Sequence, residues 1–222
     1  EDQQAIHASN KNGFGQLLTP EQLDRKTKAV TGYSWGEHFP DWYENQRYTN
    51  LLNEYRLTYG GIDSDGINIR ATDITAIMAQ VALTHANELA CPIVVQEFAK
   101  SDANRKLFSG ITKNDTPTSN PVAIKSKLVQ LHGLLLGERL SSSDDEITQS
   151  FNLLQTAQQQ NLARNNWNHI MEEGLLCDVD WQDFNTGSNN GWQQGGEDPV
   201  AMLSAWQTVL VYLMSDYMYI YE

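Results

Sequence analysis

Apolar residues recur at intervals of three or four positions over much of this 222-residue chain. Such spacing places apolar side chains on one face of a helix, because one helical turn takes 3.6 residues. Strand-like alternation is confined to short ambiguous runs such as IVVQEF. There are four apolar stripes: Ile74, Met78, Val81, His85 and Leu89; Ile124, Leu128, Leu131 and Leu135; Ile147, Phe151 and Leu154; and Leu203, Trp206, Leu210, Leu213, Tyr217 and Ile220.

Capping residues followed by proline mark where several helices begin. Thr19-Pro20, Asn120-Pro121 and Asp198-Pro199 each pair a side chain that can accept from an unbonded backbone N–H with a proline suited to the first helical position. Pro92 is expected to end or kink the helix that contains it. Together with the stripes, these residues predict helices over 20–30, 46–56, 72–90, 92–100, 121–139, 143–173 and 199–220.

The predicted fold is therefore all-α: an irregular bundle of about five to seven helices with long, aromatic-rich loops. We expect residues 1–18 to form an N-terminal arm and residues 19–222 a single helical domain. The long connectors, at 31–45, 109–120 and 177–198, are of a length that usually serves function or binding.

The formal net charge of −13 changes the range of possible partners. Duplex nucleic acid and anionic membrane surfaces are disfavoured, because the chain has no basic cluster to neutralise phosphates. No run of about 18 apolar residues predicts a membrane span. Basic proteins or cationic ligands are the partners that this charge favours.

Two cysteines, Cys91 and Cys177, are the only ones in the chain, and their spacing matches no zinc or haem motif. The chain starts at Glu1 rather than Met, which suggests a processed, exported protein that is periplasmic or extracellular. In that setting the cysteines form either one disulfide or two buried free thiols. The disulfide would contribute about 4 kcal/mol in the chain-entropy model.

The segment YGGIDSDGI contains a candidate calcium loop. Asp63 and Asp65 could supply carboxylate ligands together with backbone carbonyls. An EF-hand is excluded, because aligning Asp63 at position one puts Ile67 at position five and Ile74 at position twelve. The favoured interpretation is a glycine-rich turn leading into the next helix.

Other constellations give two alternative functions. His85 with Glu88, and His169 with Glu172, share helix faces and could form part of a metal–carboxylate bundle, although the order differs from the usual Glu-x-x-His. For His85, a hydrogen-bonded core histidine is the commoner outcome. Carboxylates at Asp41, Glu44, Asp180 and Asp183 lie among aromatics and could form a carbohydrate-binding or carbohydrate-acting cleft.

Four tryptophans fall in irregular segments: Trp35, Trp42, Trp181 and Trp192. They either pin these loops to the helices or form a partner- or ligand-binding surface. No GxSxG elbow, phosphate loop or other catalytic motif is present.

RLTYGGIDSDGINIRATDITAIMAQVALTHANELACPIVVQEF resembles a segment near the end of large exported bacterial proteins of uncharacterised type, found among planctomycetes and marine bacteria. LTPEQLDRK, TGYSW, KLVQLHGLLLGERL and DPVAMLSAWQTVLVYLMSDYMYIYE extend the resemblance over most of the chain. Proteins of this kind are often joined to, or encoded with, c-type cytochrome segments. This chain has no CxxCH, so we expect no covalently bound cofactor.

These observations favour a non-catalytic, exported accessory or scaffold subunit of a cytochrome-containing envelope redox assembly. Its partner would be a c-type cytochrome or another envelope protein, bound through acidic aromatic loops. The carbohydrate protein and the metal–carboxylate protein remain the alternatives.

Overall fold

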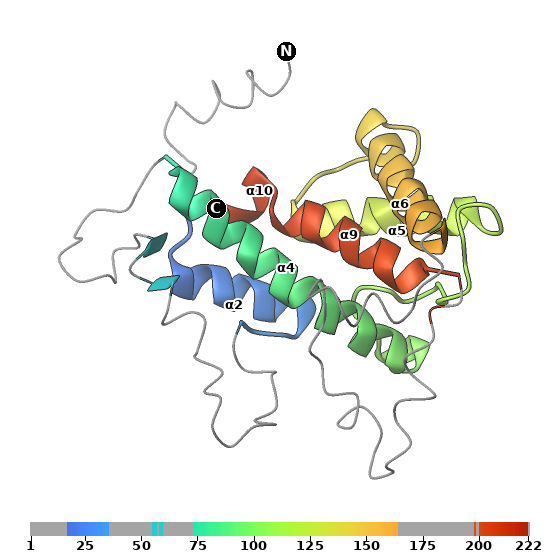
Figure 1. Ribbon diagram of the computed structural model, residues 1–222, viewed down its shortest axis with the longest axis horizontal. Coiled ribbons are helices and arrows are strands. Elements are labelled where there is room, and N and C mark those ends of the chain that lie inside the picture. Colours follow the sequence, from blue (N-terminus) through green and yellow to red (C-terminus); the bar gives the residue numbers. More distant parts are fainter. Residues whose placement is uncertain are drawn as a thin grey trace, which may run out of the picture.

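The computed structural model describes residues 17–35, 55–56, 58–59, 73–163, 198 and 200–221. These residues contain six α-helices, one short 3-10 helix and no strand, so the protein is all-α as expected (Figure 1). The helices are α2 (Pro20–Thr31), α4 (Ala76–Ala99), α5 (Pro121–Leu135), α6 (Asp145–Ala163), α9 (Met202–Met214) and α10 (Tyr217–Ile220), and the 3-10 helix is Asp102–Asn104.

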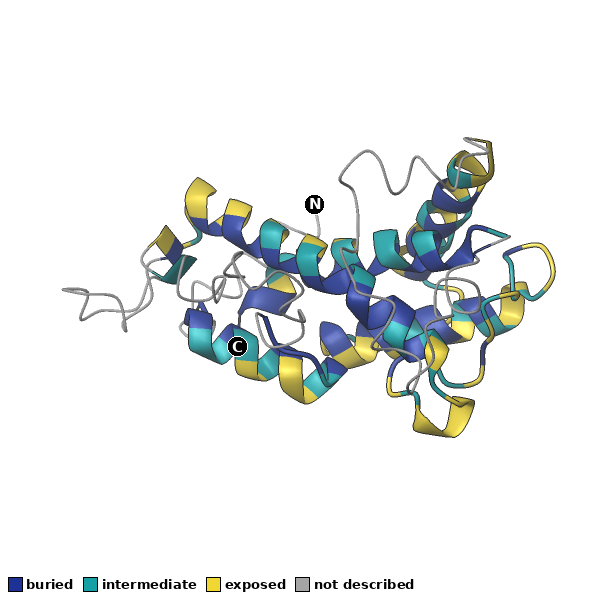
Figure 2. Ribbon diagram, turned by 60° about the horizontal axis from the view of Figure 1, so that its bottom comes forward, coloured by how far each residue is buried: buried dark blue, intermediate teal, exposed yellow. Residues whose placement is uncertain are grey.

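Helix α9 is the centre of the bundle. It packs on α4 and on α6, and α5 packs on α6 (Figure 1). Burial runs along the facing sides of these helices, while their outer sides are exposed (Figure 2). Seven side chains of α9 are completely buried: Met202, Ala205, Trp206, Val209, Leu210, Leu213 and Met214. The apolar stripes of the sequence therefore form one shared core.

Pro92 does not end its helix, contrary to one of the two outcomes expected for it. Helix α4 runs without interruption from Ala76 to Ala99, with Pro92 buried inside it. A proline here removes one backbone hydrogen bond. Leu89, Ala90 and Ile93 on either side of it are fully buried, and their burial offsets that loss.

Two of the three proline caps are confirmed. Thr19 caps α2 and Asn120 caps α5, each with proline directly after it. The third prediction is wrong in position, because α9 begins at Met202 rather than after Asp198. The buried Asp198 carboxylate still reaches that helix, and accepts from the backbone N–H groups of Met202 at 2.6 Å and Ser204 at 3.0 Å.

The predicted helix 199–220 is divided into α9 and α10. Asp216 has an extended backbone and its side chain accepts from the Met218 N–H at 2.7 Å, so it caps a new helix. The chain then turns back onto α2. Leu18 donates its N–H to the Ile220 carbonyl at 2.9 Å, and Leu17 pairs with Tyr221 in an isolated antiparallel bridge.

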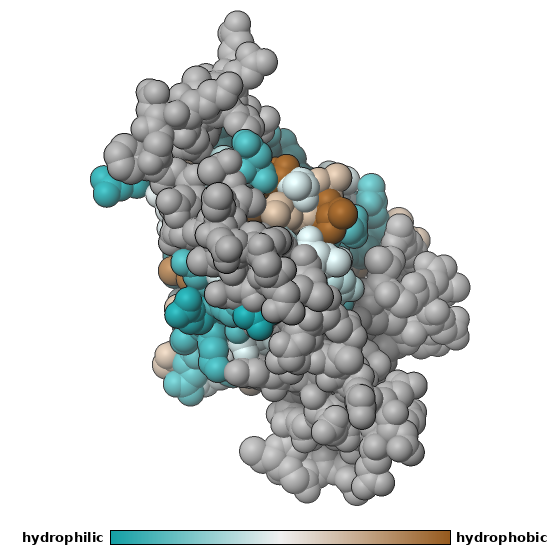
Figure 3. All heavy atoms as spheres, turned by 90° about the vertical axis from the view of Figure 1, so that its left-hand side faces the viewer, coloured by the Kyte–Doolittle hydropathy of each residue, from teal (hydrophilic) through white to brown (hydrophobic). Residues whose placement is uncertain are grey.

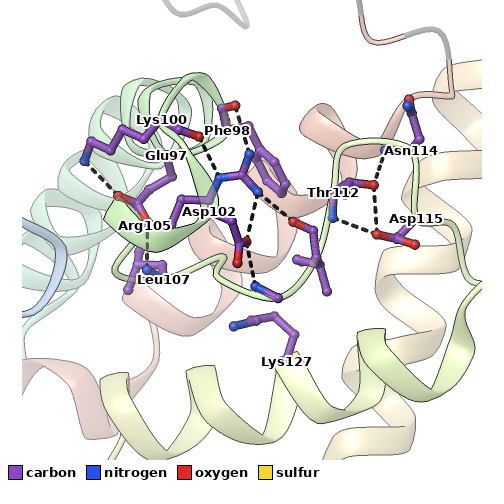
Figure 4. Close-up of polar contacts among 12 residues, drawn as sticks. Glu97, Phe98, Lys100, Asp102, Arg105, Leu107, Thr112, Asn114, Asp115 and Lys127 are labelled. Atoms are coloured by element: carbon purple, nitrogen blue, oxygen red, sulfur yellow. Dashed lines mark hydrogen bonds and ion pairs between the residues drawn. The ribbon is translucent and has the colours of Figure 1, made fainter.

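A loop between α4 and α5 is held by the guanidinium of Arg105 (Figure 4). Arg105 donates to the carbonyls of Ile111 at 2.7 Å, Lys100 at 3.1 Å and Phe98 at 3.3 Å. Its guanidinium also lies over the Phe98 ring. These contacts close the loop, and the loop places Leu107 and Phe108 in the core with no exposure.

The fully buried Glu97 carboxylate fixes the same loop from the side of α4. It accepts from the Leu107 N–H at 2.7 Å and from the Lys100 ammonium at 2.9 Å (Figure 4). A buried carboxylate is tolerated when such donors surround it.

No helix in the described part of the chain is both long enough and apolar enough to cross a membrane.

Replacing Arg105 should destabilise the whole bundle. Arg105→Ala leaves three carbonyls without their donor, and we expect the free energy of unfolding to fall by about 2–3 kcal/mol in urea titrations. Arg25→Ala is the matched control, because Arg25 is exposed and, within the described residues, donates to the Glu21 carbonyl of its own helix. It should change stability by less than about 0.5 kcal/mol. Equal effects of the two substitutions would contradict the role given to Arg105.

Candidate functional site

A hydrogen-bonded chain of three side chains joins the end of α5 to α6. His132 Nδ1 lies 2.6 Å from Glu138 Oε2, and His132 Nε2 lies 2.8 Å from Ser150 Oγ. His132 and Ser150 are buried, whereas the Glu138 side chain is about one-third exposed. The chain therefore runs from the core to the surface.

The backbone turn after α5 brings Glu138 back to His132. Gly137 has a φ of +73°, a left-handed conformation that favours glycine at the end of a helix. The Leu136 N–H donates to the His132 carbonyl at 2.9 Å, which closes the last turn. Glu138 follows Gly137 in the chain. The turn therefore brings its carboxylate back to His132, on the last turn of α5.

The three residues have the order of a carboxylate–imidazole–hydroxyl relay. In the tautomer with the proton on Nδ1, His132 Nδ1–H donates to Glu138 and Nε2 accepts from the Ser150 hydroxyl. Acyl transfer also needs an accessible nucleophile and free N–H groups to stabilise an oxyanion. Ser150 is only 1% exposed and lies inside α6, where backbone N–H groups serve the helix. The arrangement instead ties α5 to α6 and fixes the position of Glu138.

Glu138 is one of three carboxylates whose negative charge acts on Tyr212, near the end of α9. The pKa of Tyr212 is raised, first by partial burial and then by the negative charges of Asp216, Glu138 and Glu146. The Tyr212 residue is nevertheless 41% exposed. An exposed aromatic side chain is thus within electrostatic range of three carboxylates from different parts of the chain. We call these four residues the Tyr212 surface.

His85 is a hydrogen-bonded core residue, the commoner outcome for a histidine on an apolar stripe. Its Nε2 lies 3.2 Å from Thr27 Oγ1. Glu88, the other member of this pair, accepts at 2.9 Å from the Trp35 indole N–H. His85 thus hydrogen-bonds with Thr27, whereas Glu88 hydrogen-bonds with Trp35. Within the described residues, no group of three or more His, Cys, Asp or Glu side chains could hold a metal ion. His169 and Glu172 lie outside the described part of the chain.

Trp35 is buried, with 3% of its surface exposed. Its backbone N–H donates to Asp24 at 2.6 Å, and its ring stacks on Tyr55. The tryptophans were expected either to pin loops to the helices or to form a binding surface. These contacts of Trp35 pin its loop to α2 and α4.

Most other candidate residues lie outside the described residues, and their roles stay predictions. They are the calcium candidates Asp63 and Asp65, the tryptophans Trp42, Trp181 and Trp192, the cysteine Cys177, and the cleft carboxylates Asp41, Glu44, Asp180 and Asp183.

Cys91, on α4, is disulfide-bonded. Because Cys177 is outside the described residues, the pairing of these two cysteines also stays a prediction.

Comparisons of the chain with protein-family models, curated proteins and solved structures found no match. The resemblance to large exported bacterial proteins thus stays an expectation.

Sequence reasoning did not single out the chain formed by His132, Glu138 and Ser150. Part of it could have been found in KLVQLHGLLLGERL, where His132 directly follows Leu131 of the apolar stripe and Gly137 indicates a turn. Nothing in the spacing identified Ser150 as the partner, since that depends on how α6 packs.

Removing the Ser150 hydroxyl tests the structural role of the relay. Ser150→Ala leaves His132 Nε2 buried without its partner, which should lower the free energy of unfolding by about 1–3 kcal/mol in urea titrations. Ser126→Ala, at an exposed position on α5, should be nearly neutral. Labelling of Ser150 by a fluorophosphonate in the folded protein would contradict its buried, non-catalytic role.

Peptide mapping tests the cysteine pairing. Digestion without reductant should yield one cross-linked peptide containing Cys91 and Cys177, and reduction should lower stability by about 4 kcal/mol. Alkylation of both thiols in denaturant before any reduction would show that the pairing is wrong.

Proposed function

We propose that this protein is a non-catalytic accessory or scaffold subunit that binds a basic partner protein, in an exported redox assembly containing a cytochrome. The observation that carries the binding role is the Tyr212 surface. Tyrosine is a common anchor at protein interfaces, and surrounding charges select the partner and speed encounter. The place in a redox assembly comes from the sequence resemblance.

The charge around this surface supports a cationic partner. Between Glu138 and Glu146 the chain has four carboxylates, Glu138, Asp144, Asp145 and Glu146, against one guanidinium, that of Arg139. Asp216, after the end of α9, adds a fifth carboxylate whose charge acts on Tyr212. The whole protein has a net charge of −13, so its long-range field attracts the same kind of partner.

The hydrogen bond to His132 orders the Glu138 side chain before a partner binds. Its carboxylate is held at 2.6 Å by a ring that is itself fixed to Ser150. A side chain that is already ordered loses less conformational entropy when a partner binds. Lysine or arginine side chains on the partner would donate hydrogen bonds to the exposed part of the Glu138 carboxylate.

The test uses a basic c-type cytochrome as the probe in calorimetric titrations at low and high salt. Wild-type protein should bind at low ionic strength, and high salt should weaken the binding, because the contacts are between surface charges. Tyr212→Ala should weaken binding about tenfold, as expected for an aromatic anchor. Ile77→Ala is its control, since Ile77 is an exposed apolar residue on α4.

The charge contribution is tested by Glu146→Gln against Glu21→Gln. Both substitutions remove one negative charge, but Glu21 lies on α2 and pairs with Arg56. We expect Glu146→Gln to slow association and to reduce the salt dependence, while Glu21→Gln has the smaller effect. Equal effects of both variants would show that net charge acts without a specific surface. Absence of any salt-sensitive binding would overturn the proposal.

A further inference from the structure

The contact between α2, α4 and α10 is built around one buried histidine ring. We propose that His85 makes this contact an acid-sensitive latch, which is closed near neutral pH and opens when the ring takes up a proton. The latch consists of Thr27 on α2, His85 on α4, Tyr219 on α10 and Trp35 after α2.

Thr27 holds the centre of the latch. Its Oγ1 lies 2.8 Å from the Tyr219 hydroxyl and 3.2 Å from His85 Nε2, and it donates to the Leu23 carbonyl at 2.9 Å. The Trp35 ring meets the His85 ring edge-on, with centroids 4.9 Å apart. Thr27 and His85 have no exposed surface.

The neutral imidazole suits this place and the charged one does not. His85 Nδ1 is buried and has no hydrogen-bond partner among the described residues. In the neutral ring it can remain an acceptor without a proton. In the imidazolium both nitrogens donate, so a charged N–H would point into a region lined by aromatic rings.

The charged groups nearby do not compensate for an imidazolium. On α2, the Asp24 carboxylate accepts from the Trp35 backbone, and the Lys26 ammonium lies over the Tyr219 ring. On α4, Glu88 accepts from the Trp35 indole. The hydroxyl of Tyr219, on α10, stays protonated because burial raises its pKa. Burial lowers the pKa of His85 from 6.5 to about 3.

The sign of the pH effect follows from proton uptake. Once the latch opens, His85 is in water and regains its ordinary pKa of about 6.5, so between about pH 6.5 and 3 the open state binds one proton more than the closed state. The closed state is fully favoured above pH 6.5, and opening becomes about tenfold easier for each pH unit below it.

The latch can open without unfolding the core because its contacts lie at one end of the bundle. Lys26 donates to the Tyr219 carbonyl at 2.6 Å, and Leu18 donates to the Ile220 carbonyl at 2.9 Å, so two hydrogen bonds tie α10 to α2 and to the residue pair before it. The packing of α9 on α4 and α6 is separate from these bonds (Figure 1). From the left-hand side of Figure 1, described apolar side chains reach the surface beside hydrophilic ones (Figure 3). Peripheral elements of this kind open at lower cost than core helices.

Amide hydrogen exchange of the intact protein tests the latch. The reporter is the Leu18 N–H, which bonds to Ile220, and the reference is the Ala205 N–H in α9. After correction for intrinsic exchange rates, the opening equilibrium at Leu18 should rise about a hundredfold between pH 7.5 and 4.5. The Ala205 value should change much less. Equal changes at both amides, or none at Leu18, would overturn the proposal.

Two variants separate titration of the ring from loss of a contact. His85→Gln keeps a polar side chain but cannot take up a proton in this range, so the opening at Leu18 should lose its pH dependence whatever its absolute level. Thr27→Val removes the hydroxyl at the centre of the latch but keeps the histidine. It should raise opening at all pH values and retain the slope. A slope that persists in His85→Gln would assign the acid effect to other groups and sink the proposal.

Discussion

Burial of α9 is the constraint on which the rest of the structure depends. This helix is apolar on most of its surface, so it can be stable in water only if other helices cover several of its sides. Helices α4 and α6 provide most of that cover, and α5 packs behind α6. Phe108 extends the cover from a loop, with its ring 5.2 Å from the Trp206 ring. The irregular arrangement of the bundle follows from enclosing one central helix.

The polar residues inside the protein act at the edges of this apolar core. Arg105 and Glu97 hold the loop that carries Phe108, His132 ties α5 to α6, and His85 joins α4 to the ends of the described chain. Each is buried or nearly so, and each satisfies partners from a different element. Such groups add less net stability than the same volume of apolar contact, but leaving one without a partner is costly. They therefore select one arrangement of helices over other compact ones.

The helices were predictable because their signals are local: α5 and the core of α4 appear where the apolar spacing places them, and α2 begins at the Thr19-Pro20 cap. Their ends were less predictable. Pro92 is tolerated because its neighbours are buried, and the division at Asp216 depends on a side-chain cap that competes with continued helix. The histidine networks could not be predicted from the sequence, because Ser150 and Thr27 are identified as partners only by how the helices pack.

The pairing of α2 with α10 also bears on how the chain acquires its fold. Lys26 and Tyr219, which meet directly, are 193 positions apart in the sequence. Contacts of such long range form late, because closing a large loop costs entropy before any contact repays it. During synthesis α2 emerges early, yet its partner helix follows almost the whole of the described chain. The contacts between α2 and α10 can therefore form only after α10 has been synthesised. Until then, the apolar side of α2 is covered by α4 or by chaperones bound to the nascent chain.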